Sequence, residues 1–217
     1  METLHSIPKI IHYCWFGEKK PSSLSQKCIS SWQKVMPNFE IKLHNESNTN
    51  FDTPLLQYLY KQKSWAFISD YIRLRILYEE GGIYLDVDME VLQSFEPLLD
   101  HSVFLGYESK ERLNSSVLGS HAQEAFLKAC MDYMDQHFLE KKPYQIAPEV
   151  MSNVYASYVD KVTVLQESYF YPYNPYDKYR NAKTLKNAEI AENTYAIHHW
   201  EKQWSMSWLE RLRRKIL

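Results

Sequence analysis

The feature that most restricts the fold lies in the middle of the chain, where a long helical pattern runs directly into two glycines and a strand pattern. Apolar residues predict a helix over Ser64–Glu80 and cover much of its circumference, so we expect it to pack on more than one side. Gly81 stands where a glycine commonly caps a helix. Only 5 of the 217 residues are glycine, so the adjacent pair at 81–82 indicates a need for backbone freedom. Ile83–Val91 is then predicted as a strand.

The first part of the chain predicts a parallel strand–helix–strand unit. Lys9–Trp15 is a short apolar run typical of a buried strand, and Phe39–His44 alternates as a second strand does. Between them Ser22–Met36 is predicted as a helix, opened by a capping box from Ser23 to Gln26. Strand, helix and strand at this spacing favour the α/β class.

The rest of the chain is less regular, and no repeat or linker divides it, so we expect a single domain. The further elements predicted are strands near Val103–Tyr107, Val162–Leu165 and Tyr195–Trp200, a helix over Gln123–Phe138, and a terminal helix from about Met206.

Charge and cysteine content exclude several classes of protein. Twenty-five Lys and Arg against 27 Asp and Glu give a net charge of -2, which argues against a dedicated nucleic-acid binder. Three cysteines without a CxxC pattern argue against a disulfide framework and favour a reducing compartment. The first residues lack the apolar stretch of a signal peptide, and no run approaches the length of a membrane span, so we expect a cytoplasmic protein.

Two aspartates near the end of the predicted strand are the first candidates for chemistry. Strand alternation places Tyr84, Asp86 and Asp88 on one face. Two neighbouring carboxylates repel each other unless a positive charge neutralises them, and oxygen ligands suit Mg²⁺ or Mn²⁺. Such a short pattern also arises by chance, so a solvated strand end remains the alternative.

Asp70 and Arg73 form a second candidate pair, because residues three apart share one face of a helix. The helix is otherwise apolar, so a buried or cleft-facing pair is favoured over a surface one. The carboxylate would accept hydrogen bonds from sugar hydroxyls, and the guanidinium fork suits phosphate or a sugar. A structural salt bridge is the alternative.

Three blocks of sequence together resemble glycosyltransferase family 32, whose relatives include yeast-type mannosyltransferases, bacterial polysaccharide enzymes and the clostridial glucosylating toxins. The blocks span most of the chain, in the family's order: Ile7–Gly17 (IPKIIHYCWFG); Ala66–Arg73 (AFISDYIR) with Gly81–Asp88 (GGIYLDVD); and Tyr195–Trp200 (YAIHHW) with Trp204. The resemblance implies a single GT-A-type domain over residues 1–204, with a Rossmann-like mixed sheet flanked by helices. It also implies a UDP- or GDP-linked sugar donor, Mn²⁺ or Mg²⁺, and retention of the anomeric configuration.

The resemblance also assigns roles to particular residues. Asp86 would lie near the ribose and the metal, and Asp88 would ligate the metal directly. Asp70 and Arg73 would hold the donor sugar, and the ring of Trp15 would lie beside the nucleobase. Tyr84 and Trp204 join the substrate-binding residues. The family often ends its last motif with Gly-Ser-Trp, whereas this chain has Lys-Gln-Trp at 202–204, which leaves the contacts of those small residues in question.

His198 is the choice for a further metal ligand. It shares a strand face with Trp200, relatives usually keep the first histidine of such a pair, and a neutral imidazole suits Mn²⁺. A hydrogen-bonded core histidine is the alternative, and His199 is expected to be structural. No carboxylate stands out as a nucleophile, so we favour attack from the leaving group's own face and name no catalytic residue. Glu149 is considered for the acceptor side, with ordinary surface charge favoured.

The last residues, 205–217, predict a basic amphipathic helix that would lie on an anionic membrane surface or dock on the domain. The leading hypothesis is a metal-dependent retaining transferase that moves a hexose or N-acetylhexosamine to a lipid-linked surface-polysaccharide intermediate of the capsule or O-antigen kind. A peripheral contact with the inner face of the plasma membrane would serve that acceptor.

Two other classes remain open. One is a noncatalytic membrane- or glycan-binding module, which would use the basic tail and the many aromatic residues. The other is a phosphatase of the haloacid-dehalogenase type, which also uses Asp-x-Asp at a strand end. That phosphatase normally has Thr or Val where this chain has Glu90, which makes it the weaker alternative.

Overall fold

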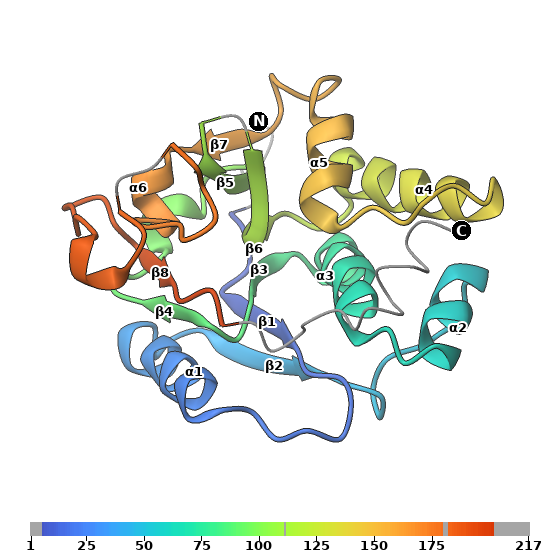
Figure 1. Ribbon diagram of the computed structural model, residues 1–217, viewed down its shortest axis with the longest axis horizontal. Helices are drawn as coiled ribbons and strands as arrows, with labels where there is room; N and C mark the ends of the chain where they lie inside the picture. Colours follow the sequence, from blue (N-terminus) through green and yellow to red (C-terminus); the bar gives the residue numbers. More distant parts are fainter. Residues whose placement is uncertain (1–5, 111, 180–181, 202–217) are drawn as a thin grey trace.

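The structure is a computed structural model that describes residues 6–110, 112–179 and 182–201 (Figure 1). Its main sheet is mixed, with six strands in the order β2-β1-β3-β6-β5-β7, and a two-stranded sheet pairs β4 with β8. The strands are β1 (Ile10–Cys14), β2 (Glu40–His44), β3 (Gly82–Leu85), β4 (Met89–Val91), β5 (Val103–Ser109), β6 (Arg112–Ser120), β7 (Thr163–Leu165) and β8 (Ala196–His198). The α-helices are α1 (Ser23–Val35), α2 (Pro54–Lys61), α3 (Trp65–Glu80), α4 (Ala125–Leu139), α5 (Ala147–Tyr155) and α6 (Glu167–Phe170), and two short 3₁₀ turns lie at Glu96–Leu98 and Leu185–Asn187.

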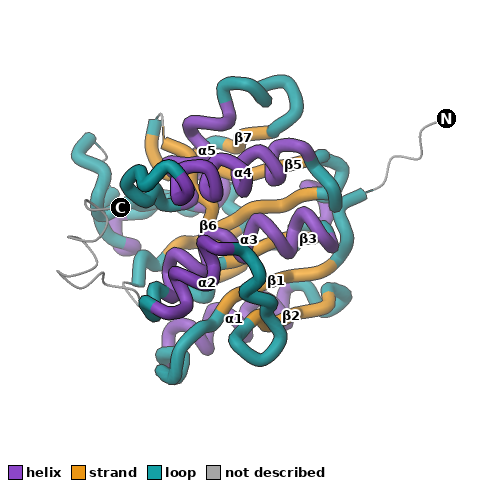
Figure 2. The backbone as a smooth tube through the Cα atoms, turned by 90° about the vertical axis from the view of Figure 1, so that its right-hand side faces the viewer, coloured by secondary structure: helices purple, strands orange, loops and turns teal. Residues whose placement is uncertain are grey.

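Two apolar cores lie on opposite faces of the main sheet. One packs α2, α3, α4 and α5 against the side chains of Tyr84 and Leu118. The other packs α1, α6 and the β4–β8 pair against the side chains of Ile83 and Leu85. Figure 1 shows these two groups on either side of the sheet, and Figure 2 is turned so that α2 to α5 lie in front of the strands. Strand alternation therefore produces the layered arrangement, and α3 is buried over most of its length, as its apolar pattern predicts.

The expected parallel unit is confirmed. β1 and β2 are parallel neighbours in register from Ile10 to Cys14, with α1 between them in the chain. The capping residue differs from the prediction. Ser22 rather than Ser23 caps α1, and its Oγ accepts a hydrogen bond from the Ser25 N–H at 3.0 Å. Gly81 caps α3 with a φ of 68°, as expected.

The prediction of one strand over Ile83–Val91 is wrong in its middle. β3 ends at Leu85, where it pairs with β6, and β4 begins at Met89 beside β8. Between them residues 86–88 make a turn, closed by a hydrogen bond of 3.0 Å from the Met89 N–H to the Asp86 carbonyl. The chain changes from one sheet to another here, so the two aspartates project from a turn and strand alternation does not orient them.

Several elements carry no strong pattern in the sequence, among them α2, α5 and the central strand β6. β6 contains the polar run Asn114–Ser115–Ser116, which interrupts the apolar alternation although the strand is buried. At Gly119 an added Cβ would lie 2.0 Å from the Phe104 ring, so glycine is needed for the close approach of β5. The predicted terminal helix and the boundary at 204 lie outside the described residues. Within those residues, no helix is long and apolar enough to cross a membrane.

A buried histidine pair links β1 and β2. His12 Nδ1 lies 3.0 Å from His44 Nε2, and His12 Nε2 lies 2.9 Å from the Gly81 carbonyl oxygen. Because that carbonyl can only accept, His12 carries its proton on Nε2, and its Nδ1 accepts from His44. Burial and the neighbouring His44 lower the pKa of His12 from 6.5 to about 4, and burial also lowers the pKa of His44.

We expect this pair to make the protein less stable in mild acid. Between pH 6.5 and 4, His12 is protonated in the unfolded chain and neutral in the folded protein. The free energy of unfolding therefore falls as the pH drops through this window. The loss is on the order of 3 kcal/mol. Urea unfolding at several pH values should show this slope in the wild type and a flatter one in His12→Gln. Equal slopes in the two proteins would contradict the account.

Candidate active site

A cavity of about 150 Å³ opens at the carboxyl ends of β1 and β3, which is where ligands bind in open α/β sheets. Helix α3 supplies one wall, and the turn between β3 and β4 supplies the other, together with the end of β8. The lining residues are Cys14, Ala66, Ser69, Asp70, Arg73, Tyr84, Asp86, Val87, Asp88, His198 and Glu201. Most of the predicted site residues are therefore brought together here.

Arg73 lies at the centre of one half of the cavity. Its Nη2 is 3.1 Å from Asp70 Oδ1 and 3.3 Å from Asp86 Oδ1, so the predicted pair on α3 is extended by an aspartate from the turn. Its Nη1 donates to the carbonyl and to the Oγ of Ser115 on β6, both at 3.0 Å. The guanidinium carbon also lies 4.5 Å from the centre of the Tyr84 ring. All of these contacts fix the arginine in one orientation.

The two aspartates that contact Arg73 differ in their surroundings. The Asp70 side chain is 11% exposed, and burial raises its pKa to about 6 against the opposing charge of Arg73. Its Oδ2 accepts from the Ala147 N–H, the first residue of α5, at 3.2 Å. The Asp86 side chain is 27% exposed, and its Oδ1 accepts from the Tyr84 hydroxyl at 3.0 Å. Asp86 is thus the more open of the two toward a ligand.

Asp88 is held from three sides in the other half of the cavity. Its Oδ2 lies 3.2 Å from His198 Nε2 and accepts from the Glu201 N–H at 2.8 Å. Its carbonyl accepts from the His199 N–H at 3.0 Å. The antiparallel pairing of β4 with β8 places Met89 opposite His198, which explains why the histidine reaches the neighbouring aspartate.

Asp86, Asp88 and His198 form a group that fits a divalent cation. One ligand atom from each lies within 4.8 Å of the others. His198 Nδ1 is buried and finds no hydrogen-bond partner among the described residues, so it can accept a ligand. Burial opposes the charge on Asp88, but the charge and hydrogen bond of His198 outweigh it and lower the pKa of Asp88. Mn²⁺ accepts an ionised carboxylate, a second carboxylate and an imidazole as donors, and His198 would give up its proton when the ion binds.

Neighbours of His198 are engaged in structural contacts. His199 Nε2 lies 2.7 Å from Glu90 Oε2, which agrees with the structural role expected for this histidine. The Trp200 ring packs on His198 with 4.1 Å between centroids, and its Nε1 donates to the Tyr173 carbonyl at 2.9 Å. Tyr171 is fully buried beside the rings of His198 and Trp200.

Three other residues considered in the sequence, Trp15, Trp204 and Glu149, are not among the described residues that line the cavity. Trp15 follows Cys14 at the end of β1, but its ring is not part of the cavity lining, and its Nε1 donates to the Lys19 carbonyl at 2.6 Å. Trp204 lies outside the described residues. Glu149 accepts a hydrogen bond from the Ile146 N–H at the start of α5 and does not line the cavity.

The sequence interpretation missed Ser115, Ala147 and Glu201. Ser115 could have been noticed, because a polar run inside an otherwise apolar segment is unusual. Ala147 acts through its backbone, and Glu201 is one charge among 27 acidic residues, so neither has a signal in the sequence.

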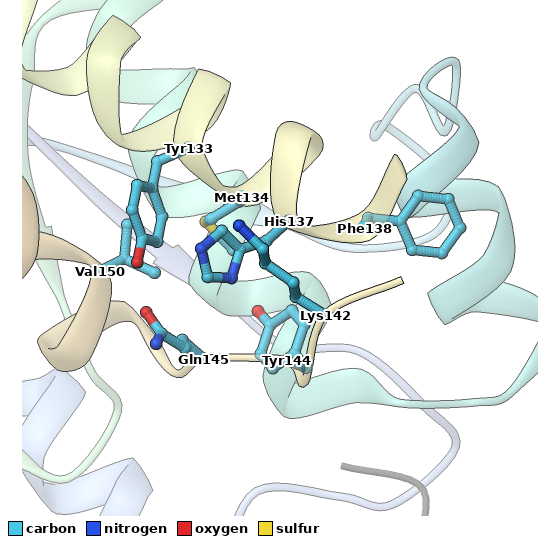
Figure 3. A pocket seen from close by; sticks show the side chains of 8 residues that line it. All are labelled: Tyr133, Met134, His137, Phe138, Lys142, Tyr144, Gln145 and Val150. Carbon is cyan, nitrogen blue, oxygen red and sulfur yellow. The ribbon is translucent and has the colours of Figure 1, made fainter. Parts of the chain in front are cut away.

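A second pocket lies between α4, α5 and the loop that joins them (Figure 3). Tyr133 and His137 stack with 4.2 Å between ring centroids, and Lys142 and Gln145 face them from the loop. No carboxylate is among the described residues that line this pocket, so those residues offer none of the carboxylate ligands that suit Mn²⁺ or Mg²⁺. Tyr144 separates it from α3, because its ring stacks on Phe67 at 4.0 Å.

Comparison with known proteins points to the same region of the chain. Residues 22–105 match the family described as "Glycosyltransferase sugar-binding region containing DXD motif". Lactosylceramide 4-alpha-galactosyltransferase of Rattus norvegicus is 28% identical over 201 residues, which cover 83% of this chain and 55% of that protein. Inositol phosphoceramide mannosyltransferase 3 of Schizosaccharomyces pombe is 29% identical over 130 residues, 56% of this chain and 35% of that protein. The chain thus spans about half or less of the length of these curated relatives.

Solved structures show the same fold at low sequence identity. The galactosyltransferase LgtC, in complex with donor and acceptor sugar analogues, has a TM-score of 0.54 at 13% identity, with 94% of this chain and 93% of that chain covered. PaToxG glycosyltransferase has a TM-score of 0.59 at 15% identity, with 72% and 70% covered. The fold is therefore of the GT-A type, as the family resemblance implies.

Proposed function

Because residues 22–105 carry the DXD-containing sugar-binding region of glycosyltransferases, on a GT-A-type fold, we propose that this protein transfers a sugar from a nucleotide-diphosphate donor to a glycan acceptor. The match confirms the resemblance drawn from the sequence. The observation that supports the activity most directly is the convergence of Asp86, Asp88 and His198 beside the Asp70–Arg73 pair in one cavity.

In this proposal one half of the cavity binds the metal and the other half binds the donor sugar. Asp86, Asp88 and His198 would hold Mn²⁺ or Mg²⁺, and the ion would supply positive charge to stabilise the diphosphate leaving group. Asp70 accepts hydrogen bonds from donor-sugar hydroxyls, while Arg73 orients both aspartates and offers its charge to the donor. Tyr84 supports Asp86 through its hydroxyl. The placement of Trp15 beside the nucleobase and the substrate-binding role of Trp204 stay predictions.

Retention of the anomeric configuration is part of the proposal. Among the described residues, the carboxylates that line the cavity are all held by other groups: Asp70 by Arg73, Asp86 by Arg73 and Tyr84, Asp88 by His198, and Glu201 by Ser22. This arrangement supports attack from the leaving group's own face over a double displacement with a protein nucleophile.

A lipid-linked glycan is the proposed acceptor. The names of the two curated relatives refer to lactosylceramide and to inositol phosphoceramide, which are both lipids with polar heads. An acceptor of this class agrees with the expected peripheral membrane contact. The surface-polysaccharide product, the cytoplasmic location and the membrane contact of residues 205–217 stay predictions.

A donor screen tests the function. Purified protein is incubated with a panel of UDP- and GDP-linked hexoses and N-acetylhexosamines, with Mn²⁺ or with EDTA, and nucleotide release is measured. We expect release from one donor class that depends on the metal, and NMR of the product should show the donor's anomeric configuration. Vesicle or glycan binding without nucleotide release from any donor would favour the noncatalytic module instead.

A further inference from the structure

A polar contact outside the predicted site ties the end of the described chain to the start of α1. The Glu201 carboxylate lies at the N-terminus of this helix, where its Oε2 accepts from Ser22 Oγ at 2.7 Å and from Ser25 Oγ at 3.2 Å. Ser25 is fully buried, so water competes little for this contact. The positive end of the helix dipole and two hydroxyl donors both favour a carboxylate here. We call Ser22, Ser25 and Glu201 the clasp.

The same glutamate reaches the metal-binding group through its backbone. Its N–H donates to Asp88 Oδ2 at 2.8 Å, and the neighbouring His199 N–H donates to the Asp88 carbonyl at 3.0 Å. Glu201 therefore contacts two parts of the structure. Its side chain binds the start of α1, and its backbone N–H binds Asp88, the aspartate expected to ligate the metal. It also lines the cavity itself.

The chain between these contacts is held in an unfavourable conformation. Trp200 has a φ of 58°, in the left-handed region that bulky residues avoid. Such a residue persists only where its surroundings fix it on both sides. The Trp200 ring packs on His198, and its Nε1 donates a hydrogen bond to the Tyr173 carbonyl. The next residue, Glu201, is held by the clasp.

From these contacts we propose that Glu201 is a positioning residue: the clasp holds its N–H against Asp88 and so fixes that carboxylate for the metal. The proposal rests on the metal site of the proposed function. It assigns a role to Ser22, Ser25 and Glu201, which have no role in that function. Groups that orient a metal ligand in this way typically contribute 10- to 100-fold to metal affinity. Opening the clasp should therefore weaken metal binding while the fold stays intact.

The clasp can be opened without removing the cap of α1. Ser22→Asp keeps a preferred N-cap residue and places a second negative charge against Glu201. Glu201→Ala removes the same contact from the other side. The matched control is Ser23→Asp, the same change at an exposed neighbour in the first turn. Ser22→Asn retains both a cap and a donor, so it should restore most of the wild-type behaviour.

Two measurements follow these variants in the full chain. Mn²⁺ alone is titrated and the free ion is followed by electron paramagnetic resonance, and hydrogen exchange is measured in a peptide that contains residues 196–201. For Ser22→Asp and Glu201→Ala we expect about tenfold weaker Mn²⁺ binding and about tenfold faster exchange of that peptide. Ser23→Asp should match the wild type, and all variants should keep its circular dichroism.

The outcomes separate this inference from the proposed function. Wild-type Mn²⁺ affinity in both clasp variants overturns the inference, whether or not their exchange is faster, because Asp88 would then not depend on the clasp. A wild-type protein that binds no Mn²⁺ overturns it together with the metal site. The expected binding pattern without sugar transfer to any acceptor leaves the inference standing and rejects the proposed function.

Discussion

Asp88→Asn should lower the rate of donor turnover by about 10³-fold, which corresponds to about 4 kcal/mol of transition-state stabilisation. Asp88 is 6% exposed, and its carboxylate contacts His198 and the Glu201 N–H. The amide keeps the shape and can still accept from Glu201, but it removes a negative charge from the metal-binding group. The loss should therefore appear in metal binding and in turnover and should leave the fold unchanged.

Glu90→Gln is the matched control for this prediction. Glu90 lies on β4 two residues further along and pairs with His199 outside the cavity, and its side chain is 41% exposed. We expect turnover within about twofold of the wild type, because exposed ion pairs contribute little. Initial rates at saturating donor, measured over a series of Mn²⁺ concentrations, compare the two variants. Full activity in Asp88→Asn would refute the metal assignment.

Arg73→Met should destabilise the fold by about 3–5 kcal/mol, because it leaves the buried carboxylate of Asp70 without its cation. The Arg73 side chain is 7% exposed, and it contacts Asp70, Asp86 and Ser115. Burial opposes its charge, but Asp86 above all raises its pKa, so the guanidinium remains charged. Urea unfolding at pH 7 measures the loss, and activity should fall with it because both aspartates lose their orientation.

Two further variants show whether the buried charges cause this loss. Adding Asp70→Asn to Arg73→Met removes one stranded charge and leaves an acceptor for Ala147, so part of the stability should return. Arg75→Met, on the same helix, breaks a contact with the half-exposed Asp52 and should cost about 1 kcal/mol or less. An equal loss in both arginine variants would show that helix packing, and not charge, is responsible.

Local patterns predicted the parts of the fold that depend on neighbours in the chain. The helix over 64–80 with its glycine cap follows from apolar spacing and from the freedom of Gly81 at positive φ. The first strand–helix–strand unit follows for the same reason. β6 was missed because its polar residues are satisfied by partners on other elements, such as Arg73 with Ser115. No local pattern reveals such partners.

The candidate site also contains residues that local spacing identified and one that only the fold brings to it. Asp70, Arg73, Asp86 and Asp88 stand close in the sequence, so their spacing identified them before the structure placed them. The reason given for the two aspartates was wrong, since they lie on a turn between two sheets and not on one strand face. His198 was chosen mainly by resemblance, and the pairing of β4 with β8 brings it to Asp88.

By itself the sequence determined the class of fold, the helix that bears Asp70 and Arg73, and the stretch of chain that holds the two candidate aspartates. These depend on periodicity and on the chemistry of residues a few positions apart. Only the tertiary structure decided that Arg73 also meets Asp86, that His198 and Glu201 meet Asp88, and that Ser22 holds Glu201. Those contacts join distant segments, and their geometry exists only once the sheets are paired and the chain is packed between them.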